Sequence, residues 1–105
     1  MAKFVKVARV QDIQPGQKRI VDADGVLIVV VNLAGRFYAL EDVCTHDGGP
    51  LGEGRLDAAT GHLICPRHGA EFDVRTGEAI TLPAFEPAPT YEVRVEGDDV
   101  LVETW

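Results

Sequence analysis

Two short boxes of the sequence contain both cysteines and two of the three histidines. The first box holds Cys44 and His46 as C-x-H, and the second, eighteen residues later, holds Cys65 and His68 as C-x-x-H. Each box therefore offers one thiolate and one imidazole. A two-iron cluster with split ligation needs two cysteines on one iron and two histidines on the other. Two loops that each supply one ligand of each type fit a [2Fe–2S] cluster.

Two other uses of these residues stay open at this point. The cysteines could form a disulfide, but this would leave the histidines unexplained, and disulfides are rare in the cytoplasm. A Cys₂His₂ zinc site is the stronger alternative. Zinc fingers, however, pair like with like, as C-x₂₋₄-C and H-x₃₋₅-H. The one-residue gap between Cys44 and His46 and the mixed pairing argue against zinc.

Composition and charge exclude several classes of function. The chain has 105 residues, the size of one domain, and its seventeen acidic against ten basic residues give a net charge of −7. This is the wrong sign for nucleic-acid binding. The longest apolar run, Val26–Val31, is far shorter than the roughly 20 residues of a membrane helix. Lys3 and Lys6 stand where a signal peptide would be apolar, so we expect a cytoplasmic protein that contacts neither nucleic acid nor membrane.

The elements around the two boxes are predicted to be strands. Eleven glycines and six prolines interrupt the chain, and no window between them has the apolar period of a helix. Val26–Asn32 is apolar without alternation, which predicts a central strand covered on both faces. Further strands are expected at Gln17–Asp22, Arg36–Leu40, Tyr91–Glu96 and Val100–Val102, with turns at Asp24-Gly25, Ala34-Gly35 and Gly97-Asp98.

The middle of the chain differs from both ends. Val43 to Pro83 holds seven glycines, three prolines, both cysteines and all three histidines. We expect a single domain over residues 1–105, with a loop-rich segment of about residues 43–83 inserted in a β base formed by residues 1–42 and 84–105. This segment is expected to have little apolar core of its own, because it has few large apolar residues.

The two boxes resemble the signature of the Rieske [2Fe–2S] proteins. Phe72–Gly77, Leu82–Ala84 and the last hairpin are also similar, so the resemblance covers nearly the whole chain. It implies an all-β fold of stacked antiparallel sheets, with a loop-rich cluster-binding subdomain at one tip.

The same resemblance implies the roles of the four ligands. Cys44 and Cys65 would hold the inner iron of one [2Fe–2S] cluster, and His46 and His68 the outer iron, nearest solvent. The edges of the two histidines, with Gly49, Pro50 and Leu51 as an apolar rim, are expected to form the docking surface.

Differences from one branch of the family indicate which branch the sequence resembles more. Rieske proteins of respiratory and photosynthetic complexes carry an extra cysteine in each box, where Gly49 and Arg67 stand here. They also carry a serine and a tyrosine whose hydroxyls donate hydrogen bonds to the cluster. Ala70 and Phe72 stand at those two positions here, and neither side chain has a hydroxyl to donate. The sequence resembles instead the soluble Rieske-type ferredoxins of bacterial ring-hydroxylating oxygenase systems. This implies a monomeric one-electron carrier between a flavin-dependent ferredoxin reductase and a terminal oxygenase.

No catalytic site is expected in the chain itself. A terminal oxygenase needs a mononuclear iron on two histidines and a carboxylate, and only His62 is left for it. We interpret His62 as a surface strand residue. Gly52-x-Gly54 lacks the third glycine of a nucleotide fingerprint.

Two alternative functions remain at the level of the sequence. The small subunit of an assimilatory nitrite reductase has a Rieske-like fold, but its members often lack the ligands. A zinc-binding structural module is the other alternative.

Overall fold

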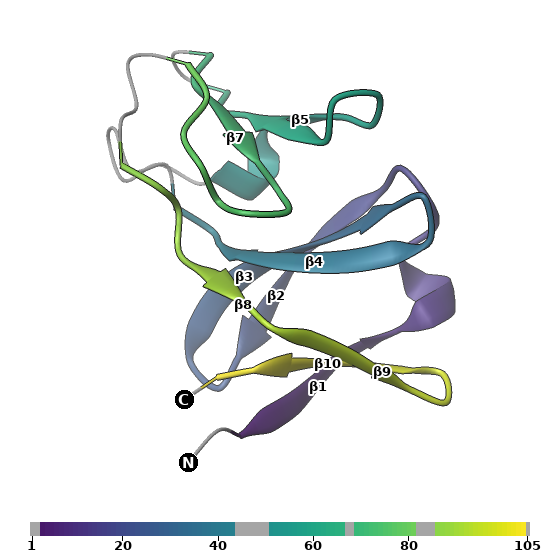
Figure 1. The fold of residues 1–105 in the computed structure, drawn as a ribbon. Helices are drawn as coiled ribbons and strands as arrows, with labels where there is room; N and C mark the ends of the chain where they lie inside the picture. Colours follow the sequence, from purple (N-terminus) through teal and green to yellow (C-terminus); the bar gives the residue numbers. More distant parts are fainter. Residues whose placement is uncertain (1–2, 44–50, 67–68, 82–85, 105) are drawn as a thin grey trace.

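The structure is a computed structural model that describes residues 3–43, 51–66, 69–81 and 86–104. Within these ranges the chain forms ten strands and two single-turn 3₁₀ helices, arranged as three antiparallel sheets (Figure 1). The strands are β1 (Phe4–Arg9), β2 (Lys18–Ala23), β3 (Val26–Leu33), β4 (Arg36–Glu41), β5 (Arg55–Asp57), β6 (His62–Ile64), β7 (Glu71–Asp73), β8 (Thr90–Tyr91), β9 (Val93–Glu96) and β10 (Asp99–Glu103). The 3₁₀ helices are η1 (Val10–Asp12) and η2 (Leu51–Glu53).

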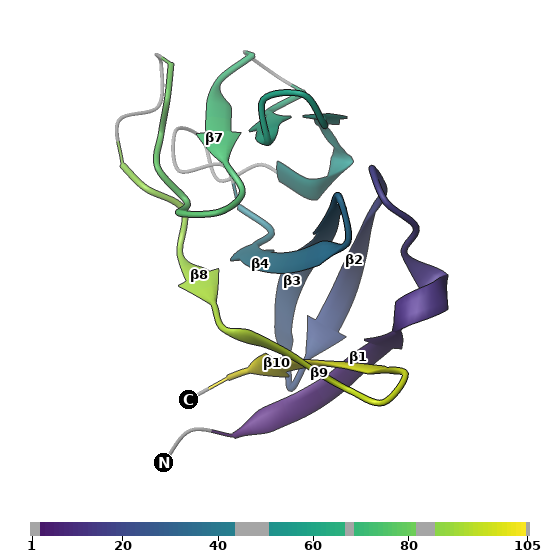
Figure 2. The same ribbon diagram turned by 45° about the vertical axis from the view of Figure 1, so that its right-hand side comes forward.

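Both ends of the chain build the base of the molecule. The first sheet has the order β1-β10-β9, and the second has the order β2-β3-β4-β8. The third sheet, β5-β6-β7, lies on the far side of the second sheet from β1 and β10 (Figures 1 and 2). The prediction of stacked antiparallel sheets is confirmed.

The strand β3 is the centre of the fold. Val29 and Val31 pack in the apolar core shared with the third sheet, and Ile28 and Val30 pack in the core shared with the first sheet. All four side chains are fully buried. Successive side chains of a strand point to opposite faces, so the four consecutive residues of β3 that lie between the two cores are all apolar. The predicted central strand is confirmed.

Two predicted turns share a backbone conformation that explains their residues. Asp24 and Gly25 have φ angles of 56° and 91°, and Ala34 and Gly35 have φ angles of 53° and 92°. Two consecutive positive φ angles define the type I′ turn, which fits the twist of a two-residue hairpin. The turns join β2 to β3 and β3 to β4 in the expected order.

The strand predicted at Tyr91–Glu96 is wrong as a single element. Tyr91 pairs with Ala39 in the second sheet, whereas Val93 pairs with Val102 in the first. The chain therefore crosses between two sheets at Glu92 while keeping the same alternation of side chains. Because period-2 patterning reports only which face is buried, it cannot show that the partner strand changes.

The segment that contains the third sheet shares its apolar core with the second sheet. Leu51, Leu63, Phe72 and Val74 are fully buried, and they join one continuous core with Val29, Val31 and Leu40. The segment thus buries its few large apolar side chains against another sheet.

In the described part of the chain, no helix is long and apolar enough to cross a membrane.

Candidate cluster site

One of the four candidate ligands, Cys65, lies in the described part of the chain. Cys44, His46 and His68 lie outside the described residues. The structure therefore describes the site through Cys65 and through the residues that border the two boxes.

The second box is the loop of a tight hairpin. The strand β6 ends at Ile64, which pairs with Glu71 at the start of β7. The Cys65 N–H donates to the Ala70 carbonyl at 2.7 Å, and the Gly69 N–H donates to the Cys65 carbonyl at 3.1 Å. Gly69 has a φ of 75°, a conformation that favours glycine. Cys65 is thus fixed at the base of a loop whose two ends are hydrogen-bonded to each other.

The Cys65 side chain fits a ligand of a buried iron. It is 2% exposed, and its thiol is free among the described residues. It belongs to the same apolar core as Leu63, Ala70 and Phe72. Thiolate is the ligand type that iron–sulfur clusters require, and burial of the sulfur shields the metal from solvent. The residue present therefore suits the inner iron that the Rieske resemblance implies for it.

The chain that leaves the first box packs beside the start of the second box. Leu51, directly after the box, is 0% exposed and shares the core of Cys65. The next turn of chain lies against the end of β6, because a Cβ at Gly54 would overlap the Ile64 carbonyl oxygen. The structure thus brings together the end of the first box and the start of the second.

The burial of Leu51 corrects the predicted docking surface. An apolar rim must be exposed to contact a partner, and Leu51 contributes no exposed surface. Gly49 and Pro50, the rest of that rim, lie outside the described residues. The error arose because a leucine next to a glycine-rich box was interpreted from its position alone.

The Gly52-x-Gly54 pair serves packing rather than nucleotide binding. A Cβ at Gly52 would lie 2.7 Å from Ile20 Cγ1 and 2.9 Å from Asp42 Oδ1. Neither distance is compatible with a side chain unless its neighbours move. The sequence offers one signal for this role, which is the position of the pair directly after the first box.

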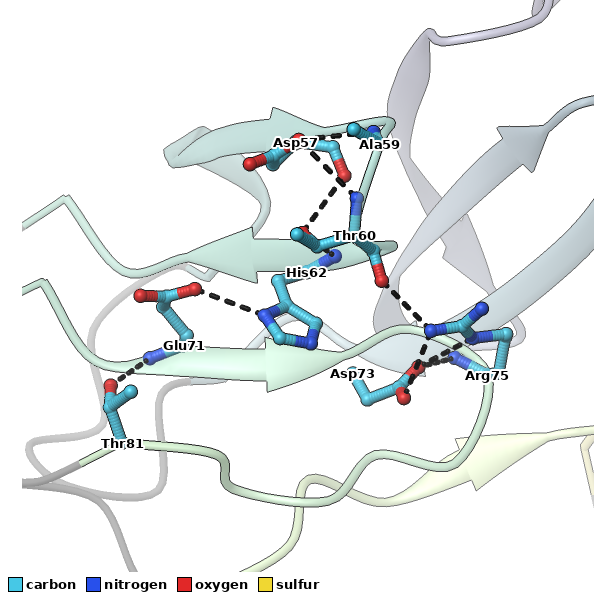
Figure 3. Close-up of polar contacts among 8 residues, drawn as sticks. All are labelled: Asp57, Ala59, Thr60, His62, Glu71, Asp73, Arg75 and Thr81. Carbon is cyan, nitrogen blue, oxygen red and sulfur yellow. Dashed lines mark hydrogen bonds and ion pairs between the residues drawn. The ribbon is translucent and has the colours of Figure 1, made fainter.

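His62 lies in a strand as predicted, but it is not a simple surface residue. Its side chain is 19% exposed, and its Nδ1 lies 3.0 Å from Glu71 Oε1 (Figure 3). In the sheet it stands opposite Asp57 on one side and Asp73 on the other. The Glu71 N–H in turn donates to Thr81 Oγ1 at 3.0 Å. The pair joins β6 to β7 close to the loop that carries Cys65.

A second set of polar contacts lies at the other end of the third sheet, around Arg75. Arg75 Nε donates to Asp73 Oδ1 at 3.0 Å, and its Nη2 donates to the Thr60 carbonyl at 2.8 Å (Figure 3). Burial raises the pKa of Asp73, but hydrogen bonds and the charge of Arg75 outweigh it and hold the pKa below its usual value. Because the folded-state pKa is lowered, this stabilisation is present at neutral pH and is lost as acid protonates the carboxylate.

The described residues hold no group of three or more histidine, cysteine, aspartate or glutamate side chains that could bind another metal ion. The hydrogen bonds of His62 and Arg75 join neighbouring segments of the third sheet. The part of the chain that the structure describes offers only the borders of the two boxes as a metal site.

Three antiparallel sheets, with the buried thiol of Cys65 beside the ends of two Cys/His boxes, are typical of a class of small β domains that bind a metal–sulfur centre. The family model of the Rieske [2Fe–2S] domain matches residues 3–92, and the chain belongs to this family. Its cofactor is one [2Fe–2S] cluster, so the zinc alternative is wrong.

Relatives of similar length carry the same fold. The 3-phenylpropionate/cinnamic acid dioxygenase ferredoxin subunit of Escherichia coli K12 is 41% identical over 95 residues, which cover 90% of this chain and 87% of the relative. The ferredoxin of carbazole 1,9a-dioxygenase from Nocardioides aromaticivorans IC177 is 35% identical, with a TM-score of 0.91 over 95% of this chain and 96% of that chain. A structure described as a nitrite reductase NADPH small subunit is 18% identical, with a TM-score of 0.80 over 95% of this chain and 97% of that chain, a likeness of fold alone.

Proposed function

We propose that this protein is the one-electron carrier of a ring-hydroxylating oxygenase system. It takes an electron from a flavin-dependent ferredoxin reductase and delivers it to a terminal oxygenase. The observation that carries this proposal is the 41% identity to a dioxygenase ferredoxin subunit over 90% of the chain. A second relative, 38% identical over 94% of this chain, comes from a complex of reduced oxygenase and oxidized ferredoxin in carbazole 1,9a-dioxygenase.

The four ligands complete the proposal. Cys44 and Cys65 hold the inner iron, and His46 and His68 hold the outer iron. When bound, a cluster of this type takes up and releases one electron. The Ala70 carbonyl fixes the backbone of Cys65, and the surrounding core keeps water from its sulfur. The chain thus binds and orients the cluster and performs no bond chemistry of its own.

The organisation of the chain is part of the same proposal. We assign a single domain to residues 1–105, with the cluster-binding segment at about residues 43–83. The third sheet, Arg55 to Asp73, lies wholly within this segment. We also propose that the carrier is a monomer and that it works in the cytoplasm, as the resemblance to soluble ferredoxins implies.

The reduction potential is expected near the lower end of the roughly −150 to +300 mV Rieske range. Hydrogen bonds to the sulfurs favour the more negative, reduced cluster, and neither Ala70 nor Phe72 carries a hydroxyl donor. Ala70→Ser and Phe72→Tyr should each raise the potential by about 20–60 mV, the equivalent of one hydrogen bond for one electron. Protein-film voltammetry measures the change.

A matched control for this prediction is Ala88→Ser. Ala88 is buried in the same core, but its N–H donates to the Gly77 carbonyl and it has no bond to Cys65. Its substitution should leave the potential unchanged. A potential near the top of the range in the parent protein would contradict the prediction.

Electron delivery is expected to slow as ionic strength rises. The oxidised [2Fe–2S] core carries a charge of +2, which two thiolates cancel, so the holoprotein keeps the chain's net charge of −7 when oxidised. Basic patches on the partners should steer so acidic a carrier, and salt screens this attraction. Stopped-flow association rates with purified oxygenase should fall about tenfold between low and high salt. Rates that do not depend on salt would rule out electrostatic steering.

A further inference from the structure

The peptide at Gly52 is held from two sides where the first box returns to the fold. The Gly52 N–H donates to Asp42 Oδ1 at 2.6 Å, and Lys18 Nζ donates to the Gly52 carbonyl. Asp42 directly follows β4, Lys18 begins β2, and Gly52 lies in η2. The bond between Asp42 and Gly52 therefore joins the two ends of residues 43–51, the segment that contains the whole C-x-H box.

The backbone of Asp42 is hydrogen-bonded to the central strand, which limits how far its carboxylate can move. Its own backbone N–H donates to the Leu27 carbonyl at 2.9 Å, which ties it to the central strand. Gly52 is buried, and a Cβ there would meet both Ile20 Cγ1 and Asp42 Oδ1. Because glycine has no Cβ, the side chains of Ile20 and Asp42 can both approach the Gly52 peptide. A hydrogen bond to a carboxylate is also stronger than one between neutral groups.

The position of Gly52 bears directly on the cluster site. Its neighbour Leu51 is buried in the core that contains Cys65. A shift of this peptide would move the end of the first box relative to the base of the second. The contacts of Asp42 and Lys18 oppose such a shift.

We propose that Asp42 is a positioning residue of the iron–sulfur site. By holding Gly52, it fixes the point at which the chain leaves the first box, beside the core that contains Cys65. Lys18 supports the same peptide from the other side. This inference rests on the proposed function, because it assumes that residues 43–51 supply two ligands of the cluster.

The test measures how fast the holoprotein loses iron to an excess of EDTA, followed by visible absorption. Asp42→Ala should lose iron about tenfold faster than the parent, equivalent to ~1.4 kcal/mol for one charge-assisted hydrogen bond. Asp42→Asn keeps an acceptor oxygen and should stay within about threefold of the parent.

Asp22→Ala is the matched control. Asp22 Oδ1 accepts a hydrogen bond from the Gly25 N–H at 2.8 Å in the turn between β2 and β3. The substitution removes the same charge and the same type of bond away from the two boxes, and it should leave the rate of iron loss unchanged.

A spectroscopic readout separates positioning from general stability. In the reduced holoprotein, Asp42→Ala should broaden the electron paramagnetic resonance lines, because the ligands would occupy a wider range of positions. Gly52→Ala breaks the same contact from the other partner. The double variant should therefore lose iron no faster than the faster single variant.

Three outcomes decide the matter. Equal rates of iron loss and equal line widths in Asp42→Ala and Asp22→Ala would overturn the role of Asp42. If Asp42→Ala does not fold, Gly52→Ala carries the test, and a parent-like rate in that variant overturns the inference. A parent protein without two irons per chain would instead refute the proposed function.

Discussion

Leu51→Asp is expected to unfold the third sheet and to yield protein without its cluster. Leu51 is 0% exposed and packs in the core that contains Leu63, Phe72 and Cys65. A carboxylate there would be buried without a described cationic partner. The cost should be roughly 4 kcal/mol or more, a large part of the 5–15 kcal/mol that stabilises a typical domain. Urea denaturation and the visible absorption of the purified variant measure both effects.

Leu27→Asp is the control for this prediction. Leu27 is 54% exposed on β3, so the same substitution buries no charge there. Because Asp22 stands opposite Leu27 in the sheet, the variant should lose about 1 kcal/mol or less of its free energy of unfolding, and it should keep the cluster. A Leu51→Asp protein as stable as Leu27→Asp would show that Leu51 is exposed in solution.

Cys65→Ala is expected to abolish cluster binding. The parent should contain about two irons and two acid-labile sulfides per chain, and the variant close to none, because no other described cysteine can replace the thiolate. Chemical analysis of iron and sulfide, together with loss of the red-brown colour, measures this result.

Val74→Ala shows whether loss of the cluster follows merely from a damaged core. Val74 is 1% exposed in the same core as Cys65, and its truncation removes more side-chain volume. The variant should be less stable by about 1–3 kcal/mol yet retain both irons. A Cys65→Ala protein that keeps a full complement of iron would refute the assignment of this ligand.

Much of the fold could be predicted from local patterns. The continuous apolar run at Val26–Asn32 predicts a strand between two cores, and Asp24-Gly25 and Ala34-Gly35 predict the turns on either side of it. Both signals arise from interactions within a few residues. A period-2 pattern reports burial, and a turn reports backbone geometry, so neither needs knowledge of distant partners.

The features that the sequence could not predict depend on contacts between distant segments. Nothing local to Tyr91–Glu96 shows that its two halves pair with different sheets. The burial of Leu51 depends on β6 and β7, which follow it in the chain. The roles of Gly52 and Gly54 likewise depend on Ile20 and on the Ile64 carbonyl.

The spacing of the cluster ligands was the most informative part of the sequence. Ligand type and interval are set by the metal centre itself, so they remain visible without the fold. Contacts between side chains and distant parts of the chain leave no such pattern. Asp42 and Glu71 look like ordinary surface carboxylates until the structure shows what each one contacts.

The continuous core between the second and third sheets has a consequence for how the carrier meets its partners. Val29 and Val31 of β3 and Leu63 and Phe72 of the third sheet pack in one core, which holds the two sheets together. Close-packed interiors resist deformation, so the two sheets tumble as one body. In the proposed function, the carrier would therefore pass from reductase to oxygenase by dissociation and rotational diffusion of the whole molecule. Its electron delivery would then depend on how fast the whole molecule leaves one partner and reorients on the next, and not on an internal domain motion.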